Sequence, residues 1–274
     1  MLRGGSKALA SLPIDHEIAP APLTGGSAEG AKTLARFVAN NLARYDEARN
    51  HPDEDATSRL SPFLHFGHLS AHEVFAAVMT HERWTTRRLG QKGGGRREGW
   101  WGVSPGAEAF LDQLGVWREL AFNTCEYVQN YADYGSLPDW ARKSLAKHRR
   151  DRRPHIYTIE QLETSATADE IWNAAQRQLV AEGWFHGYLR MLWGKKILEW
   201  SKHPADALAK MQSLMDRYSL DGRDPNSYAG YGWVLGRYDR PWPERPVFGT
   251  VRYMSSDSAR RKLKMRRFLE RYKG

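Results

Sequence analysis

The chain has 274 residues, of which 41 are Lys or Arg and 32 are Asp or Glu, so its formal net charge is +9. The single cysteine, Cys125, excludes a disulfide framework and paired-cysteine zinc or redox sites, and it predicts a reducing, cytoplasmic location. No apolar run approaches the roughly 18 to 20 residues of a membrane span. No apolar segment follows Arg3 and Lys7 as it would in a secretory signal, so we expect a protein that is neither membrane-bound nor secreted.

Positive charge is concentrated in two segments of the chain. Residues 141–154 contain seven Lys or Arg, and residues 252–273 contain nine. A solvated cationic surface can have the same composition. Clusters of this density also suit contacts with phosphates, because each neutralised phosphate releases counterions. We therefore expect a nucleic acid as the partner.

The elements predicted along the chain are helical. Residues 1–30 are rich in Gly, Ala, Pro and Ser, which is typical of an arm or linker. Apolar residues then recur at three- and four-residue spacing, which predicts helices at 31–42, 70–78, 110–121, 171–183, 185–200 and 204–218. Capping boxes are predicted at Ser70–Glu73 and Thr158–Gln161. With no alternating β-pattern, we predict an all-α fold, with one helical domain over residues 31–274.

Several familiar site motifs are missing from the sequence. There is no Walker-type phosphate loop, no dinucleotide fingerprint and no zinc-protease motif. His65, His68 and His72 are close in sequence, but the helix start predicted at Ser70 separates them, so we predict no metal site. The run Gly93–Gly95 in the glycine-rich segment 90–106 is more typical of a loop than of a phosphate cradle.

Hydroxyl groups gather just ahead of an apolar segment. Thr57, Ser58 and Ser61 lie around Arg59, and Pro62 and Phe63 follow. Hydroxyls and backbone N–H groups at a helix start can hold a pyrophosphate. An N-cap followed by core residues gives the same pattern, so both interpretations stay open.

Gln113 and Trp117 lie four residues apart and therefore on one helix face. Recognition of a base flipped out of a duplex requires a flat side chain that stacks on the base and a polar one that hydrogen-bonds its edge. An indole and an amide supply these two contacts. A core tryptophan beside a half-exposed glutamine is the alternative.

Three tryptophans, Trp172, Trp193 and Trp200, lie on two consecutive predicted helices. Trp193 and Trp200 are seven residues apart and so share a face. Because indoles are readily oxidised, neighbouring tryptophans can pass an electron hole inward from solvent. Ordinary core packing is the alternative.

The segment from Asp221 to Asn226 follows the helix that carries Arg190. A buried Arg–Asp pair beside a redox ring could tune the stability of its anionic form. A capped turn would produce the same sequence.

Taken in chain order, these segments resemble the photolyase/cryptochrome family, and specifically the FAD-binding domain of class II cyclobutane pyrimidine dimer photolyases. The segments that match are LSPFLHFG at 60–67, GWFHGYLRMLWGKKILEW at 183–200, DGRDPN at 221–226 and RPVFGTVRYM at 245–254. The similarity runs from about residue 31 to the C-terminus. No single segment is specific for this family, but the combination of all four in this order is.

The resemblance implies an all-helical domain that holds a bent FAD at the bottom of a cavity facing DNA. The positions that match the family's cofactor contacts are Tyr45, Thr57, Ser58, Arg59, Leu60, Ser61, Arg118, Asn123, Arg190, Asp221 and Gly222. Trp193, Trp172 and Trp200 match its electron-transfer chain, with Trp193 nearest the flavin. Gln113, Trp117, Trp233 and Arg252 match positions that contact the flipped lesion or fill the hole that it leaves.

The sequence departs from the family pattern in three ways. The 274 residues do not include the N-terminal α/β antenna domain that usually precedes this domain in the family. No feature of the sequence identifies a separate antenna partner. Gln113 stands where the family has a lesion-binding Glu, and Met215 stands where class II members place an Asn beside the flavin N5.

The function that the resemblance implies is light-driven repair of pyrimidine dimers in double-stranded DNA. Excited reduced FAD would donate an electron to a flipped lesion, and the protein would act as a monomer. A cryptochrome-like flavin photoreceptor is the alternative from the same family. A light-independent basic DNA-binding protein is a third interpretation.

Overall fold

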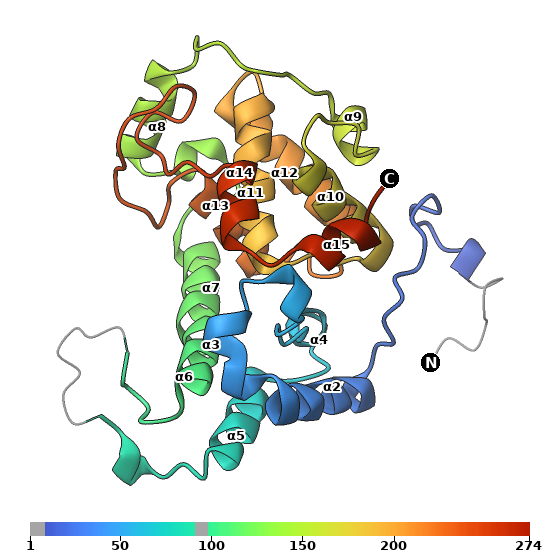
Figure 1. Cartoon of the computed structure of the whole chain (residues 1–274), viewed down its shortest axis with the longest axis vertical. Coiled ribbons are helices and arrows are strands. Elements are labelled where there is room, and N and C mark those ends of the chain that lie inside the picture. Colours follow the sequence, from blue (N-terminus) through green and yellow to red (C-terminus); the bar gives the residue numbers. More distant parts are fainter. Residues whose placement is uncertain (1–8, 91–97) are drawn as a thin grey trace.

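The computed structural model describes residues 9–90 and 98–274 of the chain. The described residues form helices joined by loops, with one isolated backbone bridge between Arg245 and Gly249 and no named strand (Figure 1). The predicted all-α class is therefore confirmed. Residues 1–8 and the run Gly93–Gly95 lie outside the described residues.

In the part of the chain that the structure describes, the N-terminal half contains α-helices that share one core. These are α2 (Ser27–Asn40), α3 (Tyr45–Ala48), α4 (Ser61–His65), α5 (Ala71–His81) and α6 (Pro105–Leu111), with short 3₁₀ turns at Leu42–Arg44, Pro52–Glu54 and Thr86–Arg88. Leu34, Phe37, Val74 and Phe110 are among the side chains of their shared core. The amphipathic spacing of these residues directs their helices toward that core.

Local capping signals decide where these helices begin. Ser70 accepts a hydrogen bond from the backbone N–H of Glu73 at 3.0 Å, which confirms the predicted start of α5. α2 begins at Ser27, four residues before the predicted start at 31, because Gly26 at φ 100° breaks the helical backbone only there. The last residues of the predicted arm are therefore helical.

A continuous helical rod leads from the N-terminal half to the C-terminal half. α6 continues through a π-helical segment, Asp112–Trp117, into α7 (Arg118–Tyr127). Figure 1 shows α6 and α7 in green running along one side of the molecule. At its far end α7 packs against α13 of the C-terminal half.

The C-terminal half is a bundle around α11. Its helices are α8 (Asp139–Lys147), α9 (Ile159–Glu163), α10 (Glu170–Glu182), α11 (Gly187–Trp200), α12 (Pro204–Tyr218) and α13 (Pro225–Val234). A second core forms here, and Trp172, Trp193, Ile197 and Met211 belong to it. Both groups of the predicted capping box at Thr158 and Gln161 form their hydrogen bonds, and Gly183 ends α10 in a left-handed conformation with φ 64°.

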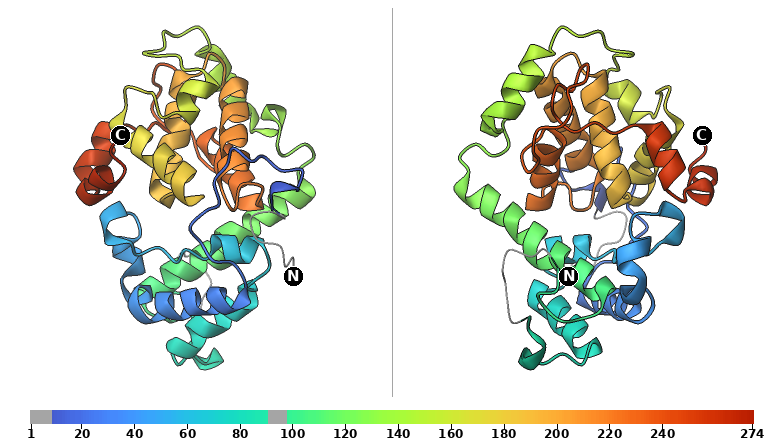
Figure 2. Two further views of the ribbon diagram at one scale, coloured as in Figure 1. Left: turned by 90° about the vertical axis from the view of Figure 1, so that its right-hand side faces the viewer. Right: turned by 60° about the vertical axis from the view of Figure 1, so that its left-hand side comes forward.

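The last two helices are α14 (Ser256–Lys262) and α15 (Arg266–Arg271), and α15 packs against both halves. Figure 2 shows them beside the segment around residue 53. The carboxylate of Asp53 accepts hydrogen bonds from the backbone N–H groups of Arg267 at 3.1 Å and Phe268 at 2.8 Å. The backbone N–H of Lys264 donates to His51 Nδ1 at 3.1 Å. We call this set of contacts the C-terminal clasp.

Candidate cofactor and nucleic-acid site

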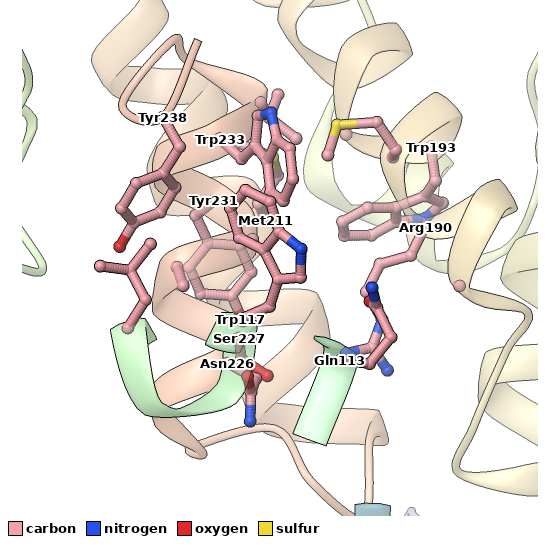
Figure 3. Close-up of a pocket in the computed structure, with 17 residues that line it drawn as sticks. Gln113, Trp117, Arg190, Trp193, Met211, Asn226, Ser227, Tyr231, Trp233 and Tyr238 are labelled. Atoms are coloured by element: carbon pink, nitrogen blue, oxygen red, sulfur yellow. The ribbon is translucent and has the colours of Figure 1, made fainter. Parts of the chain in front are cut away.

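A cavity of about 250 Å³ lies where the π-helical segment meets α11 and α13 (Figure 3). Gln113 and Trp117 face it from the π-helical segment, Arg190 and Trp193 from α11, and Trp233 from α13. Each side of the cavity therefore comes from a different part of the chain.

Two indoles form an aromatic wall of the cavity. The rings of Trp117 and Trp233 pack with their centroids 4.5 Å apart and an interplanar angle of 30°. The edge of the Tyr238 ring packs against Trp233. Such a wall offers flat apolar surfaces on which a base can stack.

An ion pair lies beside this wall. Arg190 Nη2 contacts Asp221 Oδ1 at 3.3 Å, and the Asp221 side chain is almost fully buried. Ser219 donates to the same oxygen at 2.6 Å, and the hydroxyl of Ser61 also hydrogen-bonds the carboxyl group. Burial raises the pKa of Asp221, but Arg190 and these hydroxyls outweigh it and hold the pKa below its usual value.

The predicted phosphate-binding stretch divides into two groups of contacts. Ser61 reaches the Arg190–Asp221 pair. Arg59 instead contacts Glu182 at 3.2 Å and Asp55 at 3.1 Å. Its guanidinium lies 3.9 Å from the centre of the Trp184 ring, and its φ of 57° is in the left-handed region. Arg59 is therefore held mainly by contacts within the protein.

The other members of the stretch differ in their surroundings. Leu60 is a buried core residue, and its backbone N–H donates to Ser58 Oγ at 3.4 Å. Thr57 Oγ1 is buried, and within the described residues it has no hydrogen-bond partner. Tyr45 is buried against Phe37 and Phe110, and this burial raises the pKa of its phenol.

Buried polar atoms without partners test whether FAD fits here. Among the described residues these include the Thr57 hydroxyl and Arg190 Nε. A buried donor without a partner is costly, so such atoms mark places where a bound group supplies the missing hydrogen bond. A guanidinium and hydroxyls suit the carbonyl oxygens of a flavin and the oxygens of its pyrophosphate. The residues therefore fit FAD.

The three predicted tryptophans form a contiguous series. The rings of Trp193 and Trp172 are nearly parallel, with centroids 6.2 Å apart and an interplanar angle of 4°. Trp200 meets Trp172 edge-on at 5.6 Å, and Tyr157 meets Trp200 at 5.1 Å. Because only Trp193 of these lines the cavity, the series starts there and runs away from it.

Three further predicted residues lie at the edge of this geometry or outside it. Arg118 contacts Glu119 at 2.5 Å and covers the Phe122 ring, and Asn123 is exposed on α7. Neither is among the residues that line the cavity. Arg252 lies over the Trp242 ring at 5.1 Å.

Met215 and Gly222 lie next to each other behind the cavity. Met215 is fully buried, and from α12 it is Met211, one turn earlier, that lines the cavity. A Cβ atom at Gly222 would lie 2.3 Å from the carbonyl oxygen of Met215. The close approach of these two backbones therefore requires glycine at 222.

Sequence reasoning missed three residues of this region. Asp112 lies directly behind Gln113 and Trp117 and hydrogen-bonds both side chains. His186, before α11, is buried beside the backbone of Arg49. Burial lowers the pKa of His186 to about 4. Lys195 is buried against the end of α13. No local pattern in the sequence marks any of them.

The three clustered histidines do not form a site together. His65 Nδ1 contacts Asp224 Oδ2 at 3.2 Å, whereas His68 Nδ1 accepts from the backbone N–H of Gly26 at 3.1 Å. Over residues 9–90 and 98–274, no group of three metal-binding side chains is present. Over the same residues, the structure contains no helix with the length and hydropathy of a membrane span.

In both basic segments most of the charged side chains are exposed and some are paired with carboxylates; in the segment 141–154 the paired ones are Arg142 and Lys147. In the segment 252–273, carboxylates pair with Arg260, Lys264, Arg266 and Arg271. Part of the positive charge of this segment is therefore paired within the protein. In the segment 141–154, Arg149, Arg150 and Arg152 are exposed.

The fold and the cavity define the class of protein: an all-helical domain with an aromatic-walled cavity between two packed halves. No protein-family model matches the chain. It is 37% identical over 259 residues to a deoxyribodipyrimidine photo-lyase of Methanothermobacter thermautotrophicus, covering 94% of this chain and 53% of that protein. It is 40% identical to a deoxyribodipyrimidine photo-lyase of Potorous tridactylus, covering 89% of this chain and 42% of that protein.

Solved structures share the fold of this chain. A cryptochrome of Synechocystis superposes with a TM-score of 0.69 at 15% identity, over 95% of this chain and 48% of that one. A photolyase of Sulfolobus tokodaii superposes with a TM-score of 0.62 at 19% identity, over 92% of this chain and 48% of that one. The chain belongs to the photolyase/cryptochrome family, and it spans about half the length of the curated relatives it matches.

Proposed function

We propose that this chain carries the FAD-binding, DNA-facing part of a light-driven repair enzyme, a deoxyribodipyrimidine photo-lyase of the class II type. The observation that carries the proposal is the convergence on one cavity of three features. These are the Trp117–Trp233 wall, the Arg190–Asp221 pair and the inner end of the tryptophan series. The names of the relatives at 37% and 40% identity support the same activity.

The proposed cofactor is FAD, held by residues of both halves. Arg190 and Asp221 would hold the flavin ring, and the free hydroxyl of Thr57 would bind the pyrophosphate. When bound in its reduced form, FAD would supply one electron to a pyrimidine dimer on excitation by light and would take it back once the cyclobutane ring has opened. The protein contributes orientation and charge, and it shields the reaction from water.

The proposed substrate is a pyrimidine dimer flipped out of double-stranded DNA. Trp117 and Trp233 would stack against the flipped bases, and Gln113 would hydrogen-bond a base edge. Arg252 would support the hole left in the duplex. Trp172 and Trp200 would pass electrons from solvent to Trp193. We further propose that the protein acts as a monomer.

A cryptochrome-like photoreceptor is the second candidate function. It is favoured by Gln113 and Met215, which replace the Glu and the Asn of the resemblance at the lesion and the flavin. A photoreceptor needs FAD and the tryptophan series but no dimer splitting. The two candidates therefore differ in one measurable activity.

The deciding experiment uses the full chain reconstituted with FAD and chemically reduced. It is mixed with a duplex that contains a single thymine dimer and illuminated with blue light, and the loss of the dimer is measured by chromatography. We expect light-dependent repair that Trp117→Ala strongly reduces and that Trp100→Ala, at an exposed indole remote from the cavity, leaves unchanged. A protein that binds FAD but leaves the dimer intact would instead be a photoreceptor.

A further inference from the structure

The π-helical segment 112–117 brings three side chains together at the edge of the cavity. The indole N–H of Trp117 donates to Asp112 Oδ2 at 2.8 Å, and the amide nitrogen of Gln113 donates to the same oxygen at 3.2 Å. In an α-helix, with 3.6 residues per turn, residues five apart point in different directions. The wider π-helical turn brings Asp112 and Trp117 onto one face.

This arrangement decides which end of the Gln113 amide faces the cavity. A carboxylate offers only acceptors, so Asp112 can bind Gln113 only through its NH₂ group. Within the described part of the chain, no group donates to Gln113 Oε1. Gln113 lines the cavity, and because Asp112 holds its NH₂ group, its carbonyl oxygen is left free there as a hydrogen-bond acceptor.

We propose that Asp112 is a positioning residue that locks the Gln113 amide with its acceptor toward the flipped base and holds the Trp117 indole beside it. The inference rests on the proposed function. The group recognised on the base is an N–H donor, such as the imide N–H of a thymine. A Gln113 side chain that rotated freely would turn its NH₂ group toward the base as often as its oxygen. By fixing the amide, Asp112 makes Gln113 present an acceptor, as the carboxylate of a glutamate at this position would do unaided.

The test changes the hydrogen-bonding character of residue 112 in steps. The measured quantity is selectivity, the ratio of the dissociation constants for an undamaged duplex and for the same duplex with one thymine dimer, in the dark with FAD bound. We expect Asp112→Asn, which no longer fixes the amide, to lower selectivity about twofold, since half of the molecules are then misoriented. We expect Asp112→Lys, which can only donate and so reverses the amide, to lower it about tenfold.

The background at residue 113 separates positioning from a general structural effect. In a Gln113→Glu background, the side chain presents an oxygen whichever way it rotates. There the orientation of residue 113 no longer matters and only the effect on Trp117 remains, so we expect both substitutions at Asp112 to lower selectivity less than they do in the wild-type background, a non-additivity that measures the coupling. Glu126→Lys, at an exposed position of α7, is the control for added positive charge, and we expect it to strengthen binding to both duplexes equally.

Two results would overturn the inference. One is an equal loss of selectivity from the Asp112 substitutions in the wild-type and Gln113→Glu backgrounds, which would make Asp112 a purely structural residue. The other is unchanged selectivity in Asp112→Lys. A wild-type protein that binds both duplexes equally would instead overturn the proposed function together with the inference.

Discussion

At the scale of single residues, burial accounts for the groups with the most altered chemistry. Lys195 is 1% exposed, and its ammonium group donates to the backbone carbonyl of Val234 at 2.6 Å, at the end of α13. Loss of hydration lowers the pKa of Lys195 from its usual 10.5 to about 7. The same α13 carries Trp233, so this buried amine supports the cavity wall from behind.

Lys195 makes stability depend on pH. Between pH 7 and 10.5 the unfolded chain binds this proton and the folded chain has lost it, so stability should rise with pH across that window. Each unit of the pKa difference corresponds to about 1.4 kcal/mol. Lys195→Met should flatten the rise, which urea midpoints at pH 7 and at about pH 9.5 would measure.

The neighbouring Lys196 is the matched control for this prediction. It pairs with Glu199 at 2.8 Å and with Asp169 at 3.5 Å, and its pKa is raised despite its partial burial. Lys196→Met should lower stability without flattening the pH dependence. If Lys195→Met keeps the full dependence, another group causes it.

Gly222 gives a second prediction at this scale. Because a Cβ atom there would meet the backbone of Met215 at 2.3 Å, Gly222→Ala should destabilise the protein by about 1–3 kcal/mol. Gly230→Ala within α13 is the control, since a Cβ atom there meets nothing within 4 Å, and it should be neutral or slightly stabilising. Thermal unfolding of both variants tests the difference.

At the scale of elements, two helices of the C-terminal half determine the order of the indoles. α10 carries Trp172, and α11 carries both Trp193 and Trp200, two turns apart. Hydrogen bonds fix the rings: Trp193 Nε1 donates to Gln176 Oε1 at 2.9 Å, and Trp172 Nε1 donates to the backbone carbonyl of Trp193 at 3.1 Å. The packing of α10 on α11 thus places one indole between two others.

The tryptophan series predicts a pattern of photoreduction. Trp193→Phe and Trp172→Phe should each slow blue-light reduction of the bound FAD on the order of tenfold or more, because phenylalanine is far harder to oxidise than tryptophan. Trp140→Phe on α8, outside the series, should leave the rate unchanged. The rate is followed by flavin absorbance with an external reductant present. Equal photoreduction rates in all three variants would mean that the three tryptophans only pack the core.

At the scale of the whole molecule, the C-terminal clasp holds the two halves together across the site. The Arg190–Asp221 pair comes from the C-terminal half, and Ser61 reaches it from the N-terminal half. Asp53 caps the start of α15 from 215 residues away by hydrogen-bonding the backbone N–H of Phe268. Separation of the halves would therefore open the proposed cofactor site.

Asp53→Ala tests the clasp. Loss of the cap should lower stability by about 1–2 kcal/mol and should also speed the loss of FAD, although Asp53 lies outside the cavity. Glu47→Ala, at an exposed position of α3, is the control and should change neither quantity. The flavin-to-protein absorbance ratio after gel filtration measures retention. Normal retention of FAD in a destabilised Asp53→Ala protein would mean that the clasp is not needed to keep the proposed cofactor site closed.

The sequence by itself determined the helices and their ends. The starts of α5 and α9 and the ends of α10 and α11 follow from Ser70, Thr158, Gly183 and Pro204. Each of these signals acts within a few residues of itself, so it can be read locally. The motifs that carry the family resemblance are local in the same way.

Only the tertiary structure decided how these helices build a site. The cap of Asp53 on α15, the contact of Ser61 with Asp221 and the burial of Lys195 join residues far apart in the chain. The π-helical turn at 112–117 is local, but no residue in it signals a change from α-helical geometry. Such features depend on how separate helices pack, and the burial that packing imposes is what shifts the pKa values and leaves atoms such as Arg190 Nε without partners.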